Sequence, residues 1–534
     1  MPIELRVGVH ALVELAIGLD GAAQVQPVRG HRLPRVVGTC RGPVTRHSPR
    51  LSVCRPWLLW RKWTSPAPVF DQNAPTGGGA SPPVPGCRKR RYRRTVRFST
   101  SEVARATDGK LHGDDIEVDG ASIDSRSIVP GQLFVPIVAE RDGHDFVATA
   151  VDAGAAAYLA SRPVDSVVAP MIEVADTAQA LMDLGRAARA RIPGRVIGVT
   201  GSVGKTSTKD MLAAVLRTTY RTAASERSFN NELGLPLTLA GAPDDAEAAV
   251  LEMGARGVGH IALLCSIASP TVGVVTRVDG VHLEMFGSLE AVAQAKGELV
   301  EGLPADGLAV LYADQEATIA MRSRTQAQVL TFGRGPGVDV SAGDIALDAQ
   351  LRPSFELRTP WGTTDVRLAA RGEHQLMNAL AAAAAAGGVG VPLDAIAAGL
   401  AGAAVSGLRM ELDRSAGGVM VLNDAYNANP TSMNAGLDAL LAIAAGRRYA
   451  VLGVMAELGD DAAAAHRQIA ARAAAAGVTV VAVDAPDYGP DAVHVGGVDG
   501  ALDALSGLAE GDAVLVKGSR VAALERVATR LLDS

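Results

Sequence analysis

The sequence predicts an α/β protein in which two parallel-sheet domains follow a small mixed α/β domain. Apolar runs such as AAVLEM, TVGVVT and YAVLGV have the length of buried strands, and each precedes a loop, as in a parallel sheet. A glycine-rich loop ending in Lys-Thr joins one such strand to a helix. Hydrophobic residues make up 48% of the 534 residues but aromatic residues only 4%, which suits a helix-rich α/β enzyme better than a β-sandwich.

Residues 1–97 differ in composition from the rest of the chain. They carry a net charge of +13, against −19 for the remainder, and include the basic cluster RKRRYRR. Their Pro/Gly-rich run and scarce apolar periodicity predict a disordered extension. Translation from an alternative start at Val96 would leave this segment out, which the N-terminal peptide of the native protein would reveal. The alternative is binding of nucleic acid or an anionic membrane by the basic cluster, but we expect no nucleic-acid partner.

The cysteine pattern and the hydropathy of the remaining chain indicate a cytoplasmic protein. Only Cys265 lies beyond the basic segment, so there is no disulfide framework and no CxxC metal spacing. No strongly apolar, uncharged run reaches about 18 residues, and we expect no membrane insertion. The longest candidate, residues 375–404, contains Pro392 and Asp394 and predicts a packed helix followed by a turn.

Beyond the extension we expect three domains, at residues 98–191, 192–405 and 406–534. The first contains IDSRSIVPGQLFVPI and is a small mixed α/β unit. The second opens with an apolar strand at 196–199, the glycine-rich loop and a helix. The third repeats the strand pattern with YAVLGV, VTVVAV and DAVLVKGSR before a closing helix. Because parallel sheets bind ligands at the carboxyl ends of their strands, two such domains in series predict a cleft between them.

The loop TGSVGKTSTKD predicts phosphate binding. Gly201 and Gly204 allow backbone N–H groups to approach phosphate oxygens, Lys205 can reach the terminal phosphates, and Thr206 can bind Mg²⁺. The usual spacing would place another glycine at position 199, where this chain has valine. The strand-to-helix context favours phosphate binding even without it.

Lysine usage points to particular positions. The chain has 44 Arg but only seven Lys, and the part after the extension has five: Lys110, Lys205, Lys209, Lys296 and Lys517. In so arginine-rich a chain, a lysine favours positions that need a compact charge or a reactive amine. Lys296 and Lys517 therefore stand out beside Lys205. For Lys296 the alternative is a solvated helix lysine next to Glu298.

Polar residues at other strand ends indicate a metal site and a second binding region. Glu252 ends one apolar strand and His282 follows another, which would suit Mg²⁺, although either could be an ordinary edge residue. In LNDAYNANPTS, polar residues crowd a turn after a short strand. Turn chemistry alone would also explain that composition.

Together these stretches resemble the Mur ligase family, and most closely the branch that adds D-alanyl-D-alanine to UDP-N-acetylmuramoyl-tripeptide. The resemblance rests on TGSVGKTSTKD, SFNNELGLPLTL, LEMGA, AKGEL, GEHQLMN, YNANP, MAELG and LVKGSR, which occur in the order typical of that branch. YNANP with NNELGLP is the specific part. The resemblance covers residue 98 to the C-terminus, and its loop also lacks the extra glycine. It implies a small N-terminal α/β domain, a central P-loop ATPase domain and a Rossmann-like C-terminal domain.

The resemblance also implies roles for individual residues. The nucleotide would contact Thr200, Gly201, Ser202, Gly204, Lys205, Thr206, Ser207, His374, Asn378, Arg409 and Asp424. Mg²⁺ would contact Thr206, Glu252, His282 and Lys296, the last as a carbamate derived from CO₂. Catalysis would depend on Lys205, Glu252, His282 and Lys296. The UDP substrate would contact Ser125, Arg126, Asn230 and Asn231, and the dipeptide Tyr426, Asn427, Asn429 and Ser432.

The implied reaction is ATP-dependent amide formation through an acyl phosphate, by a monomer whose C-terminal domain rotates to close the cleft. The chain departs from the family where T-N-I/V is common, because Arg277 replaces the asparagine, and where G-D-M is common, because it has Gly453-Val454-Met455. Two alternatives remain. One is a nucleotide-binding regulatory or scaffold protein on the same fold, supported only by Arg277 and the basic segment. The other is another ligase of this family, such as one that adds diaminopimelate, or a folylpolyglutamate synthetase.

Overall fold

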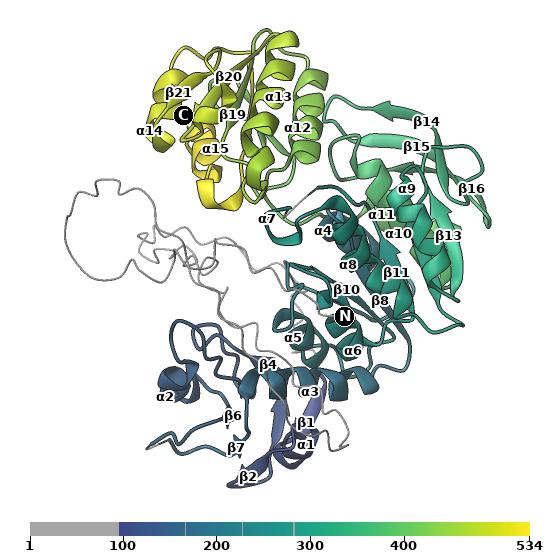
Figure 1. The fold of residues 1–534 in the computed structure, drawn as a ribbon, viewed down its shortest axis with the longest axis vertical. Helices are drawn as coiled ribbons and strands as arrows, with labels where there is room; N and C mark the ends of the chain where they lie inside the picture. Colours follow the sequence, from purple (N-terminus) through teal and green to yellow (C-terminus); the bar gives the residue numbers. More distant parts are fainter. Residues whose placement is uncertain (1–94, 166, 227, 281–282, 534) are drawn as a thin grey trace, which may run out of the picture. The chain divides into compact units, whose positions relative to one another are not determined.

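The computed structural model describes residues 95–165, 167–226, 228–280 and 283–533 (Figure 1). The basic extension expected from the sequence lies, up to residue 94, outside the described residues. Within the described residues, regular structure is already present just before the expected boundary at residue 98. Thr95 forms a β-bridge with Pro243, and the amide of the buried Val96 donates to the carbonyl of Ala242. These partners are distant in sequence, so local composition did not reveal them.

The N-terminal region is a small mixed α/β unit, as predicted. A five-stranded sheet has the order β2-β7-β6-β5-β4, with only β2 antiparallel to its neighbour. Its strands are β2 (Lys110–His112), β4 (Ala121–Ser122), β5 (Leu133–Phe134), β6 (Ala157–Ala160) and β7 (Met171–Glu173). The remaining elements are the antiparallel pair β1 (Arg97–Ser99) and β3 (Glu117–Asp119), and the helices α1 (Thr100–Ala106), α2 (Val147–Asp152) and α3 (Thr177–Ala190).

The central region contains the predicted parallel sheet, with six strands in the order β13-β12-β11-β8-β10-β9. They are β8 (Arg195–Thr200), β9 (Thr222–Ala224), β10 (Ala248–Glu252), β11 (Val272–Val275), β12 (Leu308–Tyr312) and β13 (Gln328–Phe332). The helices among them are α4 (Lys205–Leu216), α5 (Gly234–Ala240), α6 (His260–Ala268), α7 (Leu283–Phe286), α8 (Leu289–Glu301) and α9 (Glu316–Ile319). Since β8 lies between β11 and β10, strand ends flank the loop that follows it.

A small antiparallel sheet follows the parallel one and was not predicted from the sequence. It consists of β14 (Ser341–Leu347), β15 (Pro353–Thr359) and β16 (Gly362–Arg367) in that order. Buried and partly exposed residues alternate along β15, which is the pattern of a strand with one covered face.

The alanine-rich segment after this sheet forms two helices. Helix α10 (Gln375–Gly388) confirms the predicted packed helix: residues 381–386 are all alanine, all fully buried, and α10 packs on α4 (Figure 1). The expected turn at its end is short, because a second helix, α11 (Leu393–Ala401), begins there. Pro392 precedes α11 and Asp394 lies in its first turn, where both residues favour a helix start.

The C-terminal region has the predicted Rossmann-like form. Its sheet has the order β17-β18-β22-β19-β20-β21, in which only β17 is antiparallel to its neighbour. The strands are β17 (Glu411–Arg414), β18 (Met420–Asn423), β19 (Arg448–Leu452), β20 (Val478–Val483), β21 (Val493–Val495) and β22 (Ala513–Lys517). The helices are α12 (Pro430–Ala442), α13 (Ala462–Ala475), α14 (Gly497–Ala504) and α15 (Glu525–Leu532). The described part of the chain contains no helix long and apolar enough to cross a membrane.

Close packing of α11 on α4 leads to a stability prediction. A Cβ at Gly399 would lie 2.5 Å from Val215 Cα, a backbone atom that cannot rotate away. We therefore expect Gly399→Ala to destabilise the protein by about 1–3 kcal/mol through overpacking, measured as a lower Tm. Gly402→Ala at the end of α11 is the matched control, because its nearest contact would be 3.5 Å away. A higher Tm for Gly399→Ala would contradict the packing argument, since alanine is intrinsically the better helix former.

Candidate active site

The phosphate loop lies between the end of β8 and the start of α4. Gly201 and Gly204 have φ values of +148° and +85°, in the region that favours glycine. A Cβ at Gly201 would lie 1.9 Å from Thr276 Oγ1, and one at Gly204 would lie 2.3 Å from Asn378 Oδ1. Both glycines are therefore required by the backbone conformation and by the packing of neighbouring side chains.

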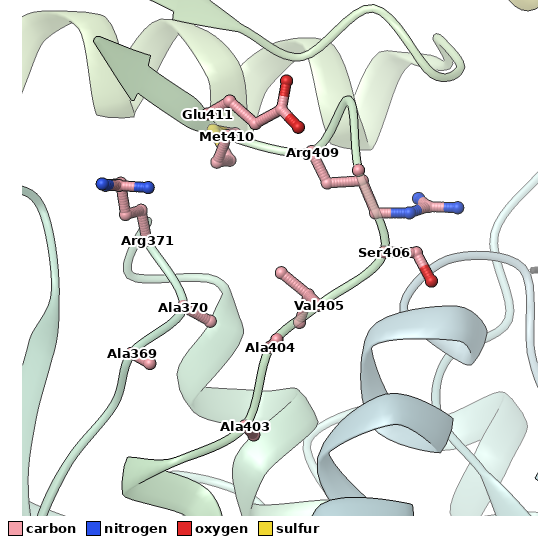
Figure 2. Close-up of a pocket in the computed structure, with 11 residues that line it drawn as sticks. Ala369, Ala370, Arg371, Ala403, Ala404, Val405, Ser406, Arg409, Met410 and Glu411 are labelled. Carbon is pink, nitrogen blue, oxygen red and sulfur yellow. The ribbon is translucent and has the colours of Figure 1, made fainter. Parts of the chain in front are cut away.

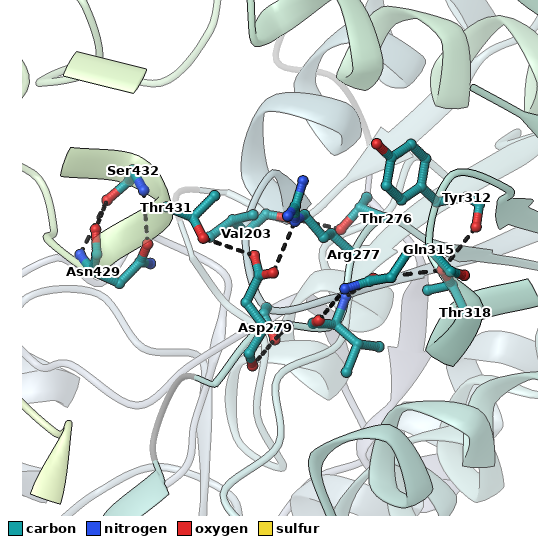
Figure 3. Close-up of polar contacts among 12 residues, drawn as sticks. Val203, Thr276, Arg277, Asp279, Tyr312, Gln315, Thr318, Asn429, Thr431 and Ser432 are labelled. Carbon is teal, nitrogen blue, oxygen red and sulfur yellow. Dashed lines mark hydrogen bonds and ion pairs between the residues drawn. The ribbon is translucent and has the colours of Figure 1, made fainter. Parts of the chain in front are cut away.

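Hydroxyl groups at the strand ends fix the course of the loop. Thr200 Oγ1 donates to the carbonyl of Met253, just beyond β10, at 2.8 Å. From the other side, Thr276 Oγ1, just beyond β11, donates to the carbonyl of Val203 at 2.6 Å (Figure 3). Thr200, which was expected to bind nucleotide, thus has a structural hydrogen bond and is fully buried.

Ser202 ties the loop to the segment after β11. Its amide donates to the carbonyl of Arg277 at 2.6 Å. Its hydroxyl donates to the carbonyl of Asp279 and accepts from the amide of the same residue, both at 2.8 Å. The Ser202 side chain, also expected to bind nucleotide, therefore shapes the loop.

Lys205 is the first residue of α4, and its ammonium folds back over the loop. Nζ lies 2.7 Å from the carbonyl oxygen of Gly201 and 3.3 Å from that of Ser202. Loss of hydration lowers the pKa of Lys205, the Glu252 carboxylate opposes this shift, and Arg409 adds to it. The cation lies at the amide-rich end of a helix, which is the arrangement that binds phosphate groups.

Arg409 reaches the first turn of α4 from the linker that leads to the C-terminal region. Its Nη2 lies 3.3 Å from Thr206 Oγ1, and its guanidinium stacks 3.9 Å from the ring centre of Tyr426. Its Nε is buried and, within the described part of the protein, has no hydrogen-bond partner. Thr206 and Ser207 are themselves buried. Since an unpaired buried N–H is unfavourable, an anionic group beside Arg409 would stabilise it.

Lys296 lies in α8 and is 2% exposed. Among the described residues, its Nζ has neither a hydrogen bond nor an ion pair. Burial holds the pKa of Lys296 well below its usual range, the nearby Lys205 lowers it further, and the Asp279 carboxylate opposes the shift. The site therefore contains a buried amine that readily loses its proton.

The alternative of a solvated Lys296 beside Glu298 is wrong. Glu298 is 6% exposed and accepts hydrogen bonds from the amides of Gly259 at 2.5 Å and Ala262 at 2.9 Å. Its carboxylate accepts these backbone hydrogen bonds at the start of α6, so it does not form the expected surface pair with Lys296.

Glu252, the last residue of β10, provides a carboxylate beside the loop. Its Oε1 accepts a hydrogen bond from Asn230 Nδ2 at 2.9 Å, whereas Oε2 is buried and has no partner among the described residues. His282, the other expected metal ligand, lies outside the described residues.

The described residues include no cluster of three or more His, Cys, Asp or Glu side chains suited to a metal. Mg²⁺ usually needs only one or two carboxylates when phosphates complete its coordination, so the free Oε2 fits this ion.

His374 and Asn378 lie at the start of α10, next to α4. Asn378 Nδ2 donates to Gln375 Oε1 at 2.8 Å, and its Oδ1 lies 3.4 Å from Thr208 Oγ1. Burial lowers the pKa of His374, with the Asp424 carboxylate opposing the shift. The structure thus places Asn378 beside the helix that follows the phosphate loop, and His374 at the start of α10 near Asp424.

Asp424 forms a buried ion pair with Lys517. Lys517 Nζ lies 2.5 Å from Asp424 Oδ2 and also donates to the carbonyl of Asn427 at 2.9 Å. Asp424 Oδ1 accepts from the amide of Met410 at 3.3 Å. This pairing gives the buried Lys517 a structural partner, and it gives Asp424 structural contacts in addition to its expected nucleotide contact.

The YNANP segment combines an interdomain contact with a helix cap. Tyr426 Oη lies 2.5 Å from Ser228 Oγ, which follows β9. The turn predicted from its composition ends at Asn429, because Pro430 begins α12. Asn429 and Ser432 form a reciprocal capping box, at 2.9 and 3.1 Å (Figure 3).

The other residues expected to contact substrate have local roles in the described structure. Ser125 and Arg126 lie in the loop after β4, on the N-terminal sheet, and exposed Arg126 forms a two-pronged pair with Asp124 at 2.9 and 2.8 Å. Asn231 Oδ1 accepts from the amide of Gly234 at 2.9 Å and so supports the start of α5.

The linker to the C-terminal region borders a cavity of about 270 Å³, formed by residues 369–371, 403–407 and 409–411 (Figure 2). The amide and hydroxyl of Ser406 donate to Asp210 Oδ2 at 2.8 and 2.7 Å, which attaches the linker to α4. Leu408 and Met410 have φ values of +61° and +53°, unusual for residues with side chains.

Asp210 and Asp279 were not identified from the sequence as site residues. Asp210 follows the loop motif by one helical turn, and Asp279 lies between a strand end and His282. Acidic residues at such positions are common, so only their three-dimensional contacts distinguish them.

Two family models match the chain. One, described as the Mur ligase middle domain, matches residues 199–386, and another, described as the Mur ligase, glutamate ligase domain, matches residues 408–520.

Proteins with the same name are similar over most of the chain. The UDP-N-acetylmuramoyl-tripeptide–D-alanyl-D-alanine ligase of Mycobacterium tuberculosis is 41% identical over 464 residues, which cover 77% of this chain and 91% of that protein. The Escherichia coli protein of that name is 37% identical over 462 residues, covering 82% and 99%.

Solved structures agree with these sequence relatives. MurF from Acinetobacter baumannii superposes with a TM-score of 0.76 at 31% identity, over 82% of this chain and 99% of that one. MurF ligase from Thermotoga maritima in complex with ADP gives a TM-score of 0.68 at 28% identity, over 77% and 96%. The chain belongs to the Mur ligase family.

Proposed function

We propose that this protein is an ATP-dependent ligase that joins D-alanyl-D-alanine to UDP-N-acetylmuramoyl-tripeptide, in the cytoplasmic synthesis of peptidoglycan precursors. The observation that carries this proposal is that three groups beside the central sheet lie close enough to interact electrostatically: the Lys205 ammonium with the Glu252 carboxylate, and Lys205 with the buried amine of Lys296. The names of relatives at 37% and 41% identity support the choice of substrates.

The nucleotide phosphates would bind to the loop backbone and to Lys205. Arg409, with its unpaired Nε, would approach them from the linker. His374, Asn378 and Asp424 would contact the rest of the nucleotide, as the family resemblance implies. The remaining loop residues, from Thr200 to Ser207, would contribute backbone amides and maintain the conformation of the loop.

Mg²⁺ would be held by Glu252 and Thr206, with His282 and a modified Lys296 completing the set. The ion would supply positive charge that offsets the repulsion between ATP and the carboxylate substrate. Asn230 would orient Glu252 through its hydrogen bond to Oε1 and leave Oε2 free for the ion.

Lys296 is suited to carbamate formation. A neutral amine nitrogen can bond to the carbon of CO₂ and release a proton, which leaves one negative charge on the new carbamate. The lowered pKa of Lys296 favours the neutral amine that this step requires. A guanidinium could not readily take this role, which agrees with lysine at this position in an arginine-rich chain.

The reaction would begin when the peptide carboxylate attacks the terminal phosphorus of ATP, forming an acyl phosphate and ADP. Lys205 would stabilise the charge that develops on the transferred phosphoryl group. The amine of D-alanyl-D-alanine would then add to the acyl carbon, and phosphate would leave as the amide forms. Closure of the C-terminal region would exclude water from the acyl phosphate.

The two other substrates would bind on different parts of the chain. Ser125 and Arg126 would contact the uridine nucleotide, and Asn230 with Asn231 the muramoyl peptide. Tyr426, Asn427, Asn429 and Ser432 would lie near the dipeptide. We also propose that the active form is a monomer, because the linker of the chain reaches its own α4 through Ser406 and Asp210.

Substrate omission tests the proposed reaction directly. The full chain should release phosphate only with ATP, Mg²⁺, UDP-N-acetylmuramoyl-tripeptide and D-alanyl-D-alanine all present. Mass spectrometry should then detect the pentapeptide product. Phosphate release in the absence of either peptide substrate would contradict the proposed ligase reaction and favour a nucleotide-binding regulatory protein.

The free oxygen of Glu252 leads to a prediction about Mg²⁺. Glu252→Gln should raise the Mg²⁺ concentration for half-maximal activity by about 10- to 100-fold, because the neutral amide is a poorer ligand. Glu247→Gln, at the opposite end of β10, is the matched control and should leave this concentration unchanged. Equal Mg²⁺ requirements for the two variants would rule out the proposed role of Glu252.

The carbamate predicts a dependence of activity on CO₂ and pH. Below the pKa of Lys296 the amine is protonated and cannot react with CO₂, so ligase activity should fall as pH decreases through that pKa. Lys296→Arg should lower kcat by about 100-fold or more, whereas Lys110→Arg, on the N-terminal sheet, should not. NMR with ¹³CO₂ should detect a carbamate in the wild type that Lys296→Arg lacks. Its absence from a folded, active wild type would refute the modification.

A further inference from the structure

Asp279 connects the phosphate loop with helix α12 (Figure 3). Its backbone amide and carbonyl both bond to the Ser202 hydroxyl at 2.8 Å. Its Oδ1 accepts from Arg277 Nε at 2.8 Å, and its Oδ2 accepts from Thr431 Oγ1 at 3.2 Å. The Asp279 side chain is only 16% exposed, so these contacts are largely shielded from water.

Thr431 is the second residue of α12, a helix of 13 residues. The side chains of Asn429 and Ser432 hydrogen-bond to each other's backbone amides in the capping box. In this turn it is the Thr431 hydroxyl that donates to Asp279. A carboxylate beside the first turn is also favoured by the helix dipole. The contact therefore joins a negative group on the central region to the positive end of a C-terminal helix.

We propose that Asp279 is a positioning residue. It holds the first turn of α12 at a fixed position relative to the phosphate loop when the ligase is closed for reaction. This proposal rests on the proposed function, because it concerns the alignment of the substrates of that reaction. It assigns Asp279 no contact with the substrates themselves.

The backbone contacts explain how the loop and the carboxylate move together. Ser202 lies within the phosphate loop and bonds to both peptide groups of Asp279, so a shift of the loop on binding phosphate displaces Asp279 as well. Arg277 neutralises the carboxylate and occupies Oδ1, which leaves Oδ2 directed to Thr431. Loop position is thereby transmitted to the start of α12 through one hydrogen bond to a charged acceptor.

The segment that α12 follows makes this coupling relevant to catalysis. Residues 424–429 include Tyr426 and Asn427, which are proposed to lie near the dipeptide. The start of α12 therefore sets the distance between the attacking amine and the acyl phosphate. Small errors in such distances reduce rates strongly, because reacting atoms must approach to about 3–3.5 Å.

Removal of the Thr431 hydroxyl tests the proposal with little change in side-chain volume. In the full chain, Thr431→Val should lower kcat about tenfold, the effect of losing a hydrogen bond to a charged acceptor. The Kd for ADP with Mg²⁺ should stay within about twofold of the wild-type value, because the loop itself is intact. Thr431→Ser keeps the hydroxyl and should restore kcat.

Thr529→Val is the matched control, since it removes a C-terminal hydroxyl whose hydrogen bond, in the part of the chain that the structure describes, is to the carbonyl of Glu525. Its kcat should equal that of the wild type. The proposal would be overturned if Thr431→Val retained the wild-type kcat, or if Thr431→Ser were as impaired as Thr431→Val.

Hydrogen exchange provides a readout that does not require turnover. Adding ADP and Mg²⁺ to the wild type should increase protection of the amides in the first turn of α12, and Thr431→Ser should behave alike. Thr431→Val should lose this nucleotide-dependent increase but keep normal exchange in α15. An unchanged increase in Thr431→Val would refute the coupling. An inactive wild type that shows the coupling would reject only the proposed reaction.

Discussion

The hydrogen bonding of the phosphate loop to its two neighbouring strand ends is the constraint on which the site depends. Thr200 ties the loop to the end of β10, and Thr276 ties it to the end of β11. The crowding at Gly201 and Gly204 shows how little space these contacts leave. Because Glu252 ends β10 and Asp279 follows β11, the same contacts fix both carboxylates relative to the loop. The parallel order of the sheet is thus what assembles the site.

The charges around the loop are only partly compensated within the protein. Among the described residues, Lys205 hydrogen-bonds to two carbonyl groups, Lys296 has no partner, and the buried Nε of Arg409 has no acceptor. Buried polar groups are normally paired, so such a collection is unfavourable for the protein alone. A polyanion would satisfy the arginine and Lys205, and a cation would satisfy the free oxygen of Glu252. The electrostatics therefore favour nucleotide and metal binding together.

Local sequence predicted the parts of the site that depend on local structure. The loop and the strands that flank it followed from spacing and composition. Lysine scarcity predicted special environments for Lys296 and Lys517, and both are 2% exposed. Val199 breaks the usual spacing because β8 continues through it as a buried strand residue. The sequence could not predict the sheet β14–β16, the pairing of Lys517 with Asp424 or the capping of α12. The sheet depends on strand pairing, and the ion pair depends on a contact between residues distant in sequence. The cap depends on which of several competing local hydrogen bonds forms.

The Arg277–Asp279 pair explains how a positive side chain is accommodated where the family often has asparagine. An isolated guanidinium beside the loop would oppose the binding of Mg²⁺, since like charges at short range repel strongly in a partly buried site. Arg277 is bonded at 2.8 Å to a carboxylate two residues away, so the pair adds little net charge beside the proposed metal site. That carboxylate keeps its second oxygen for Thr431. The ion pair therefore limits the net charge that Arg277 adds beside the loop.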